Sequence, residues 1–142
     1  MKLIPKDIKN IIEKNTNPKN LIYHGNNYIL VIDPKHNSKN YHYTAWHKKD
    51  IRSLLELRKK DIFEIKSLIK NIKHLNLVPG DCEIYIHFPP NFWRLHIHFV
   101  SKTFYNIYKN TNNETYLVED ILGNLSKNEN YYRQNVNIKA NL

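Results

Sequence analysis

Strict alternation of apolar and polar residues marks two stretches near the middle of the chain. Every second residue from Cys82 to Phe88 is apolar, and so is every second residue from Leu95 to Phe99. Successive side chains of a strand point to opposite faces of a sheet, so each stretch is predicted to be a strand with one buried face. Pro89-Pro90-Asn91 lies between them and favours a turn, which makes the pair a hairpin.

Helical spacing of apolar residues marks three further stretches. The first helix is predicted after Pro5 and ends near residues 15–18. The principal helix is predicted over residues 61–75, before Pro79-Gly80, and a third helix over residues 117–125. The isoleucines of the first helix form an apolar stripe that suits either the core or a dimer contact.

Short apolar runs predict the remaining strands. Residues 21–23 and 28–32 flank Gly25-Asn26-Asn27 as a second hairpin, residues 41–45 form another strand, and residues 136–140 form the last one. This order of elements is typical of an α+β fold with a mostly antiparallel sheet, one long helix and shorter flanking helices. A length of 142 residues fits a single domain over 1–142.

Composition narrows the setting and the partner. The sequence contains no apolar run long enough to cross a bilayer and no secretory signal pattern, so we expect a cytoplasmic protein, or else a nuclear one. The net charge of +9 favours an anionic partner, although abundant Lys, Asn and Ile also suit A+T-rich coding DNA. The single cysteine, Cys82, falls in the apolar alternation and is expected to be a small core residue.

The polar face of the strand around residue 96 carries the candidate chemistry. Arg94, His96 and His98 fall on that face, and antiparallel pairing brings His87 of the neighbouring strand close to them. A guanidinium offers a planar fork to phosphate oxygens, and a neutral imidazole can attack phosphorus or exchange a proton at neutral pH. The cluster therefore favours chemistry on a phosphate chain.

Two other interpretations of these histidines are open. They could lie on a solvated strand face without a function, or three of them could supply ligands to zinc. No cysteine or acidic residue stands at a ligand spacing beside them, and Arg94 would repel a cation, so we expect no metal and no cofactor. The other histidines lack a partner pattern and are expected at the surface: His24, His36, His42, His47 and His74.

The segment from His87 to Phe99 resembles the His-φ-His-φ-His-φ-φ motif of the histidine triad hydrolases, and within them it is most similar to the scavenger mRNA decapping enzymes. The likeness spans about residues 22–139. Three other stretches resemble the same family in the same order, the last of them the segment that opens the family's final strand: Ile32-Asp33-Pro34-Lys35, Asp50-Ile51-Arg52-Ser53-Leu54 and Tyr131-Tyr132-Arg133-Gln134.

This resemblance implies roles for the hairpin residues. His96 corresponds to the middle histidine, which becomes covalently nucleotidylated in the family, and His98 corresponds to the last one. Arg94 replaces the first histidine of the triad, Asn91 stands where the family has a phosphate-contacting serine, and Phe92 replaces a tyrosine. These departures alter the polar chemistry around a nucleophile that is retained.

The resemblance also implies a way of binding the substrate and an assembly. It assigns Asp33 to hydrogen bonding with the base or ribose of a capped nucleotide, and Lys35 to its phosphates. The family's separate amino-terminal domain, which closes over the cap, has no counterpart here and is expected to be absent. The expected assembly is a homodimer with two equivalent sites.

Together these features predict a pyrophosphatase that hydrolyses m7GpppN-type cap dinucleotides or short capped RNA through a nucleotidyl-His96 and releases m7GMP. His98, Arg94 and His87 would hold the non-bridging phosphate oxygens. The alternatives are the same chemistry on a dinucleoside polyphosphate or a nucleoside phosphoramidate, and a non-catalytic nucleotide- or RNA-binding module.

Overall fold

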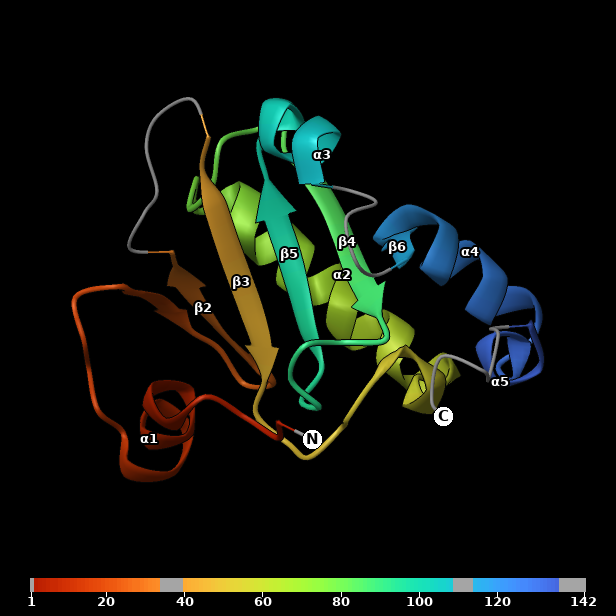
Figure 1. The fold of residues 1–142 in the computed structure, drawn as a ribbon, viewed down its shortest axis with the longest axis horizontal. Helices are drawn as coiled ribbons and strands as arrows, with labels where there is room; N and C mark the ends of the chain where they lie inside the picture. Colours follow the sequence, from red (N-terminus) through yellow and green to blue (C-terminus); the bar gives the residue numbers. More distant parts are fainter. Residues whose placement is uncertain (1, 34–39, 109–113, 136–142) are drawn as a thin grey trace.

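One antiparallel sheet organises the protein (Figure 1). The computed structural model describes residues 2–33, 40–108 and 114–135. The elements in chain order are α1 (Lys6–Lys14), β1 (Leu21–His24), β2 (Tyr28–Ile32), β3 (His42–His47), the 3₁₀ turn η1 (Leu54–Glu56), α2 (Lys59–His74), β4 (Glu83–Phe88), β5 (His96–Val100), α3 (Lys102–Tyr108), β6 (Glu114–Leu117), α4 (Val118–Lys127) and α5 (Tyr131–Asn135).

The strand order is β1-β2-β3-β5-β4-β6, and neighbouring strands pair antiparallel throughout. The predicted α+β class with a mostly antiparallel sheet is therefore confirmed. The two predicted hairpins, β1–β2 and β4–β5, are both present, and β5 lies between β3 and β4 at the centre of the sheet.

The main core lies on the face of the sheet that α2 and α4 cover (Figure 1). The alternate residues Tyr43 and Ala45 of β3 and Ile97 and Phe99 of β5 point into it. From α2 it receives Ile65, Leu68 and Ile72, which share one side of the helix because they are spaced three or four residues apart. Burying one such side chain contributes roughly 1.5–3 kcal/mol, so this face holds the sheet together.

The opposite face of the sheet is covered only in part by α1. Ile8 and Ile11 of this helix are 3% and 0% exposed and pack with Ile29, Val31 and Trp46. The apolar stripe of the first helix therefore belongs to a core inside the chain, one of the two uses expected for it. The rest of this face, over β3, β5 and β4, carries the polar side chains of the alternating strands.

Several elements differ from the sequence-based prediction. Residues 131–134, matched to the opening of a final strand, lie in α5, where Tyr132 packs into the core and its hydroxyl accepts a hydrogen bond from Asn124 Nδ2 (3.0 Å). The short strand β6 and the helix α3 were not predicted, since four strand residues and an unpatterned seven-residue helix give little periodicity. The strand predicted over 136–140 lies outside the described residues. In the described part of the chain, no helix combines the length and apolarity that a bilayer crossing needs.

Candidate functional site

The β4–β5 hairpin brings three of the predicted site histidines together. Tyr85 pairs with His98 across the two strands, so His87, two residues further along β4, faces the β5 histidines. The His98 ring lies with its centroid 5.0 Å from that of His87 and 5.0 Å from that of His96. The strand alternation read from the sequence therefore does produce a compact group of imidazoles on one sheet face.

A fourth histidine, His42, completes this group and was wrongly expected at the surface. Its Nε2 lies 2.8 Å from Nδ1 of His98, and the two rings stack at 5.0 Å. The cause is the position of β3 next to β5, where Thr44 pairs with His98 and Trp46 pairs with His96. The alternation of His42, Thr44 and Trp46 in the sequence was the available sign. We call His42, His87, His96 and His98 the histidine cluster.

His96 is held in one tautomer by the backbone. Its Nδ1 lies 2.7 Å from the carbonyl oxygen of Arg94, and because a carbonyl only accepts, Nδ1 must carry the proton and donate. A neutral ring then has its lone pair on Nε2. Burial lowers the pKa of His96 from 6.5 to about 4, against an opposing effect of the Arg94 carbonyl, so the ring is neutral at pH 7. The free lone pair on Nε2 suits His96 to act as a nitrogen nucleophile.

His98 and His42 form a chain of imidazoles that ends on a carboxylate. Nδ1 of His42 lies 3.5 Å from Oδ2 of Asp33, and its other nitrogen faces His98. Burial lowers the pKa of His42, partly offset by Asp33, and burial together with the neighbouring histidines lowers the pKa of His98 well below 6.5. Nε2 of His98 is buried and has no hydrogen-bond partner among the described residues. Such an atom is suited to meet a ligand.

Aromatic rings fix the orientation of the two β5 histidines. The Trp46 ring stacks on His96 at 4.2 Å with 20° between the planes, and the Tyr85 ring stacks on His98 at 4.9 Å with 11°. Because both imidazoles are clamped between strand neighbours, their nitrogens point in defined directions. Phe92, a predicted substrate-binding residue, packs edge-on against Trp46, with 6.1 Å between the ring centroids. The Lys2 ammonium lies 5.5 Å from the centroid of the Phe92 ring.

The remaining predicted residues lie around the cluster or outside the described chain. The Arg94 guanidinium donates to the carbonyls of His47 (3.1 Å) and Lys48 (3.3 Å) and lies 3.9 Å from Asp50, so in this structure it braces the loop after β3. Asn91 is exposed in the β4–β5 loop. Lys35 falls among residues 34–39, outside the described residues, and so does His36.

His47 is also buried, contrary to the surface position expected for it. It is 1% exposed and sits on the α2 side of the sheet, where it contacts Tyr28 at 4.8 Å between rings. The Lys49 backbone N–H donates to its Nδ1 (3.0 Å), which leaves the proton on Nε2, 3.5 Å from Glu64 Oε2. His47 is the last residue of β3 and does not belong to the histidine cluster.

Within the described ranges, no three His, Cys, Asp or Glu side chains converge as a metal site requires. A known family matches most of this chain. Residues 6–114 match a family described as the scavenger mRNA decapping enzyme C-terminal binding domain. The chain belongs to this family. Its fold is the histidine triad fold, as the sequence resemblance implied.

Individual relatives are distant. An m7GpppX diphosphatase from Caenorhabditis elegans is 23% identical over 140 residues, which cover 89% of this chain and 45% of the relative, so the chain spans less than half of that protein. Among solved structures, the aprataxin ortholog Hnt3 in complex with DNA is 20% identical over 67% of this chain and 58% of its own, with a TM-score of 0.53. Hnt3 from Schizosaccharomyces pombe is 14% identical, with coverages of 89% and 93% and a TM-score of 0.47. Likeness at this level concerns the fold alone.

The burial of His96 predicts a pH-dependent stability. The pKa of His96 is about 6.5 in the unfolded state and about 4 in the folded state. Between these pH values the unfolded state binds a proton that the folded state does not. The stability that neutral His96 contributes is therefore fully present above pH 6.5 and is lost as the pH falls from 6.5 to 4. Urea unfolding at about pH 7.5 and 5.5 should show this loss. In His96→Asn the loss should be smaller by about 1.4 kcal/mol. An equal loss in the wild type and in His96→Asn would contradict a neutral, buried His96.

Proposed function

We propose that this protein hydrolyses a 5′-5′ pyrophosphate-linked nucleotide, with an m7GpppN-type cap dinucleotide or short capped RNA as the substrate. The observation that carries the proposal is His96, a neutral imidazole whose Nδ1 proton is engaged by a backbone carbonyl and whose Nε2 holds the lone pair. Membership of the scavenger decapping family supports the substrate class, and the named activity of the Caenorhabditis elegans relative supports the same class.

In the first step of the proposed reaction, Nε2 of His96 attacks the phosphorus nearest the methylguanosine. The bond from phosphorus to the bridging oxygen breaks, and its electron pair leaves with a nucleoside diphosphate, which needs no proton to depart. The proton on Nδ1 of His96 stays hydrogen-bonded to the carbonyl oxygen of Arg94. This hydrogen bond stabilises the positive charge that the phosphorylated ring acquires. In the second step, water adds to phosphorus, the phosphorus–Nε2 bond breaks, and its electron pair returns to His96. Splitting the displacement into two steps is the contribution of the covalent nucleophile.

The other three imidazoles handle protons and charge. We assign the proton that water loses to Nε2 of His98, because its Nδ1 is paired with His42 and its Nε2 is unpartnered among the described residues. Once protonated, the His98–His42 pair is a cation that faces Asp33 at one end and phosphate oxygens at the other. His87 lies beside this pair, with its ring centroid 5.0 Å from that of His98. Arg94 acts here through the loop that it braces and through its carbonyl.

A second candidate substrate is a nucleotide without the methylated base, such as a dinucleoside polyphosphate. The position of Asp33 favours it: the carboxylate assigned to the capped nucleotide lies 3.5 Å from His42 and serves the histidine cluster. A carboxylate that orients a catalytic imidazole would promote cleavage of every substrate alike. Asp33 is therefore the residue on which the two candidates differ.

Replacing the nucleophile gives the first test. His96→Asn should lower kcat by several orders of magnitude while substrate binding stays nearly unchanged, since the amide fits the same space but cannot attack phosphorus. Turnover of m7GpppG followed by mass spectrometry of the products measures this. The exposed histidine variant His74→Asn is the matched control and should keep full activity. Wild-type turnover in His96→Asn, or the absence of any trapped phosphorus–His96 adduct during turnover, would contradict the covalent mechanism.

The methyl group of the cap gives the second test. The wild type should cleave m7GpppG at least about tenfold more efficiently than GpppG, about 1.4 kcal/mol, because the cationic base gains from a nearby carboxylate. Asp33→Asn should erode this ratio more than it lowers GpppG cleavage, and Glu13→Gln on α1 should not change it.

The double variant Asp33→Asn/His42→Leu separates the two roles of Asp33. If Asp33 reads the base, the ratio falls in the His42→Leu background as well. If Asp33 acts only through His42, both substrates slow equally and Asp33→Asn adds nothing to His42→Leu. Equal cleavage of both compounds by the wild type would reject the decapping assignment in favour of the second candidate.

We also propose that the active protein is a homodimer, a property that the histidine triad resemblance supports. A stable two-fold interface buries upwards of roughly 1,000 Å². Light scattering at micromolar concentration should therefore return twice the chain mass of 17.1 kDa. A monomer at that concentration would contradict the proposal.

A further inference from the structure

The side of the protein remote from the histidine cluster combines a row of lysines with a polar, aromatic-walled pocket. Both features involve α2, whose inner side covers the main core and whose outer side faces solvent. Because the β3–β5 alternation puts the histidine cluster on the opposite face of the sheet, neither feature takes part in the chemistry proposed above.

One line along the outer side of α2 carries four lysines and one aromatic ring. Lys59, Phe63, Lys66, Lys70 and Lys73 follow one another at spacings of four, three, four and three residues, which places them in one line along a helix. All of them are exposed, and Phe63 is 77% exposed. We call Lys59, Lys66, Lys70 and Lys73 the lysine stripe.

The carboxylates of α2 are turned away from this line. Asp61 is 2% exposed and accepts a hydrogen bond from the backbone N–H of Arg58 (2.8 Å) at the start of the helix. Glu64 is half-buried on the side that faces β1 and β2, next to His47. The charges of this one helix are therefore sorted, and its outer line presents positive charge to an anion, although Glu83 and Glu119 line a neighbouring groove together with Lys66 and Lys73.

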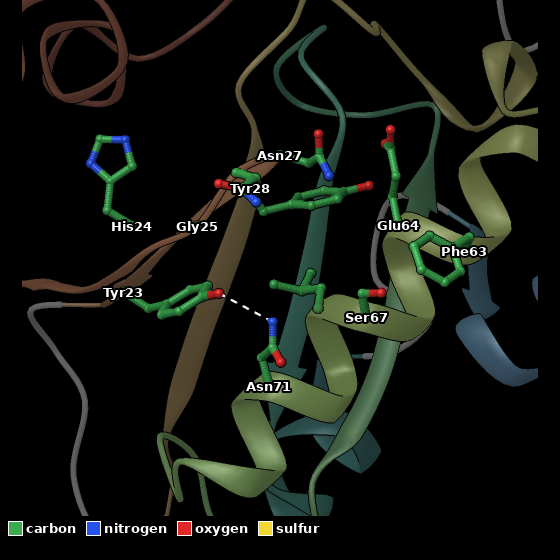
Figure 2. Close-up of a pocket in the computed structure, with 11 residues that line it drawn as sticks. Tyr23, His24, Gly25, Asn27, Tyr28, Phe63, Glu64, Ser67 and Asn71 are labelled. Atoms are coloured by element: carbon green, nitrogen blue, oxygen red, sulfur yellow. Dashed lines mark hydrogen bonds between the residues drawn. The ribbon is translucent and has the colours of Figure 1, made fainter.

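A pocket of about 390 Å³ adjoins the stripe, between α2 and the β1–β2 turn (Figure 2). Tyr23 comes from the hairpin side and Phe63 from the helix side, so aromatic rings contribute to both sides. Between them the lining is made of hydroxyl, amide and carboxylate groups, from Asn27, Ser67, Asn71 and Glu64 among others. Its size and its flat walls suit a planar ring with hydrogen-bonding edges.

The walls of the pocket are preorganised. The Tyr23 hydroxyl accepts a hydrogen bond from Asn71 Nδ2 (3.3 Å), which ties the hairpin to the helix (Figure 2). A Cβ at Gly25 would lie 2.6 Å from the Tyr23 ring, so the glycine permits the backbone to pack directly on that ring. Oε2 of Glu64 lies 3.5 Å from Nε2 of His47. A ligand ring that enters therefore meets groups already in place.

We propose that this surface, the lysine stripe with the adjoining pocket, is a binding site for single-stranded nucleic acid. The lysines contact successive phosphates, a base stacks on Phe63 or Tyr23, and the amino groups of that base donate to Glu64 and the amide oxygens. Lysines interleaved with an exposed aromatic ring are the combination that single-strand binders use. Self-association through the stripe is disfavoured, because a two-fold contact would set lysines against lysines.

Binding of a labelled, uncapped single-stranded RNA octamer, measured by fluorescence anisotropy from low to moderate salt, tests the phosphate contacts. With three or four contacts, log K should fall with log salt with a slope of roughly −2 to −3. Lys66→Glu/Lys70→Glu should weaken binding about tenfold or more at low salt and flatten the slope by about 1.4. The control Lys9→Glu/Lys14→Glu makes the same charge change on exposed positions of α1.

The control pair should bind RNA nearly as well as the wild type. Equal losses in the two charge variants would show attraction to net charge alone and would overturn the site. Failure of the wild type to bind the octamer would overturn it as well. Turnover of a short nucleotide at the histidine cluster should be unchanged in Lys66→Glu/Lys70→Glu, so failure of this site and failure of the proposed hydrolase are observed separately.

The aromatic half of the site has its own test. Phe63→Ala should weaken RNA binding at least about fivefold, since a stacked base is lost. It should leave binding of inorganic polyphosphate, which has the charge but no bases, unchanged. Leu3→Ala, which truncates another exposed apolar side chain (53% exposed), is the matched control. If Phe63→Ala and Leu3→Ala have the same effect on RNA, or if polyphosphate competes as well as RNA of equal charge, the base pocket is refuted.

Discussion

The antiparallel register of β5 between β3 and β4 is the constraint on which the rest of the structure depends. It sets Thr44 and Tyr85 on either side of His98, and thereby lets His42, His87 and His96 converge on that one ring. A slip of one residue in either pairing would send the histidines into the α2 face and the apolar partners Ile97 and Phe99 to the other. The same register determines both the burial of the core residues and the positions of the site residues. Because burial of the apolar face fixes the register, it also fixes where the histidines lie on the other face.

Burial on this sheet face also decides the charge state of the site. Four adjacent imidazoles would repel one another if protonated, but burial lowers the pKa of each, and the cluster is neutral at pH 7. Neutral rings can stack on Trp46 and Tyr85 without the desolvation cost of a buried cation. The same neutrality gives His96 its nucleophilic lone pair.

The β4–β5 hairpin could be predicted from the sequence, but the residues that pack around it could not. Alternation identified β4 and β5 because apolar residues take every second position in them, and it correctly placed His87, His96 and His98 together. It missed His42 because the neighbour of a central strand depends on sheet order, which no local pattern encodes. The alternation also placed Arg94 on the same face as the histidines. Arg94 lies before β5, however, in a segment that is not extended, and its guanidinium turns to the loop after β3. The helix at 131–135 was missed since Tyr132 is recruited by tertiary contact with Asn124.

The distribution of charge links the two faces of the molecule. The net charge of +9 comes from an excess of lysine and arginine side chains. Among the described residues, the charged side chain beside the imidazoles of the histidine cluster is the carboxylate of Asp33. On α2, by contrast, every exposed charged side chain is a lysine. At the proposed single-strand site a polyanion would meet these lysines on the outer surface, away from the neutral histidine cluster. Such a separation would let the protein hold a nucleic acid strand without loading its catalytic histidines, because the long-range field and the short-range chemistry reside on different sides of one sheet.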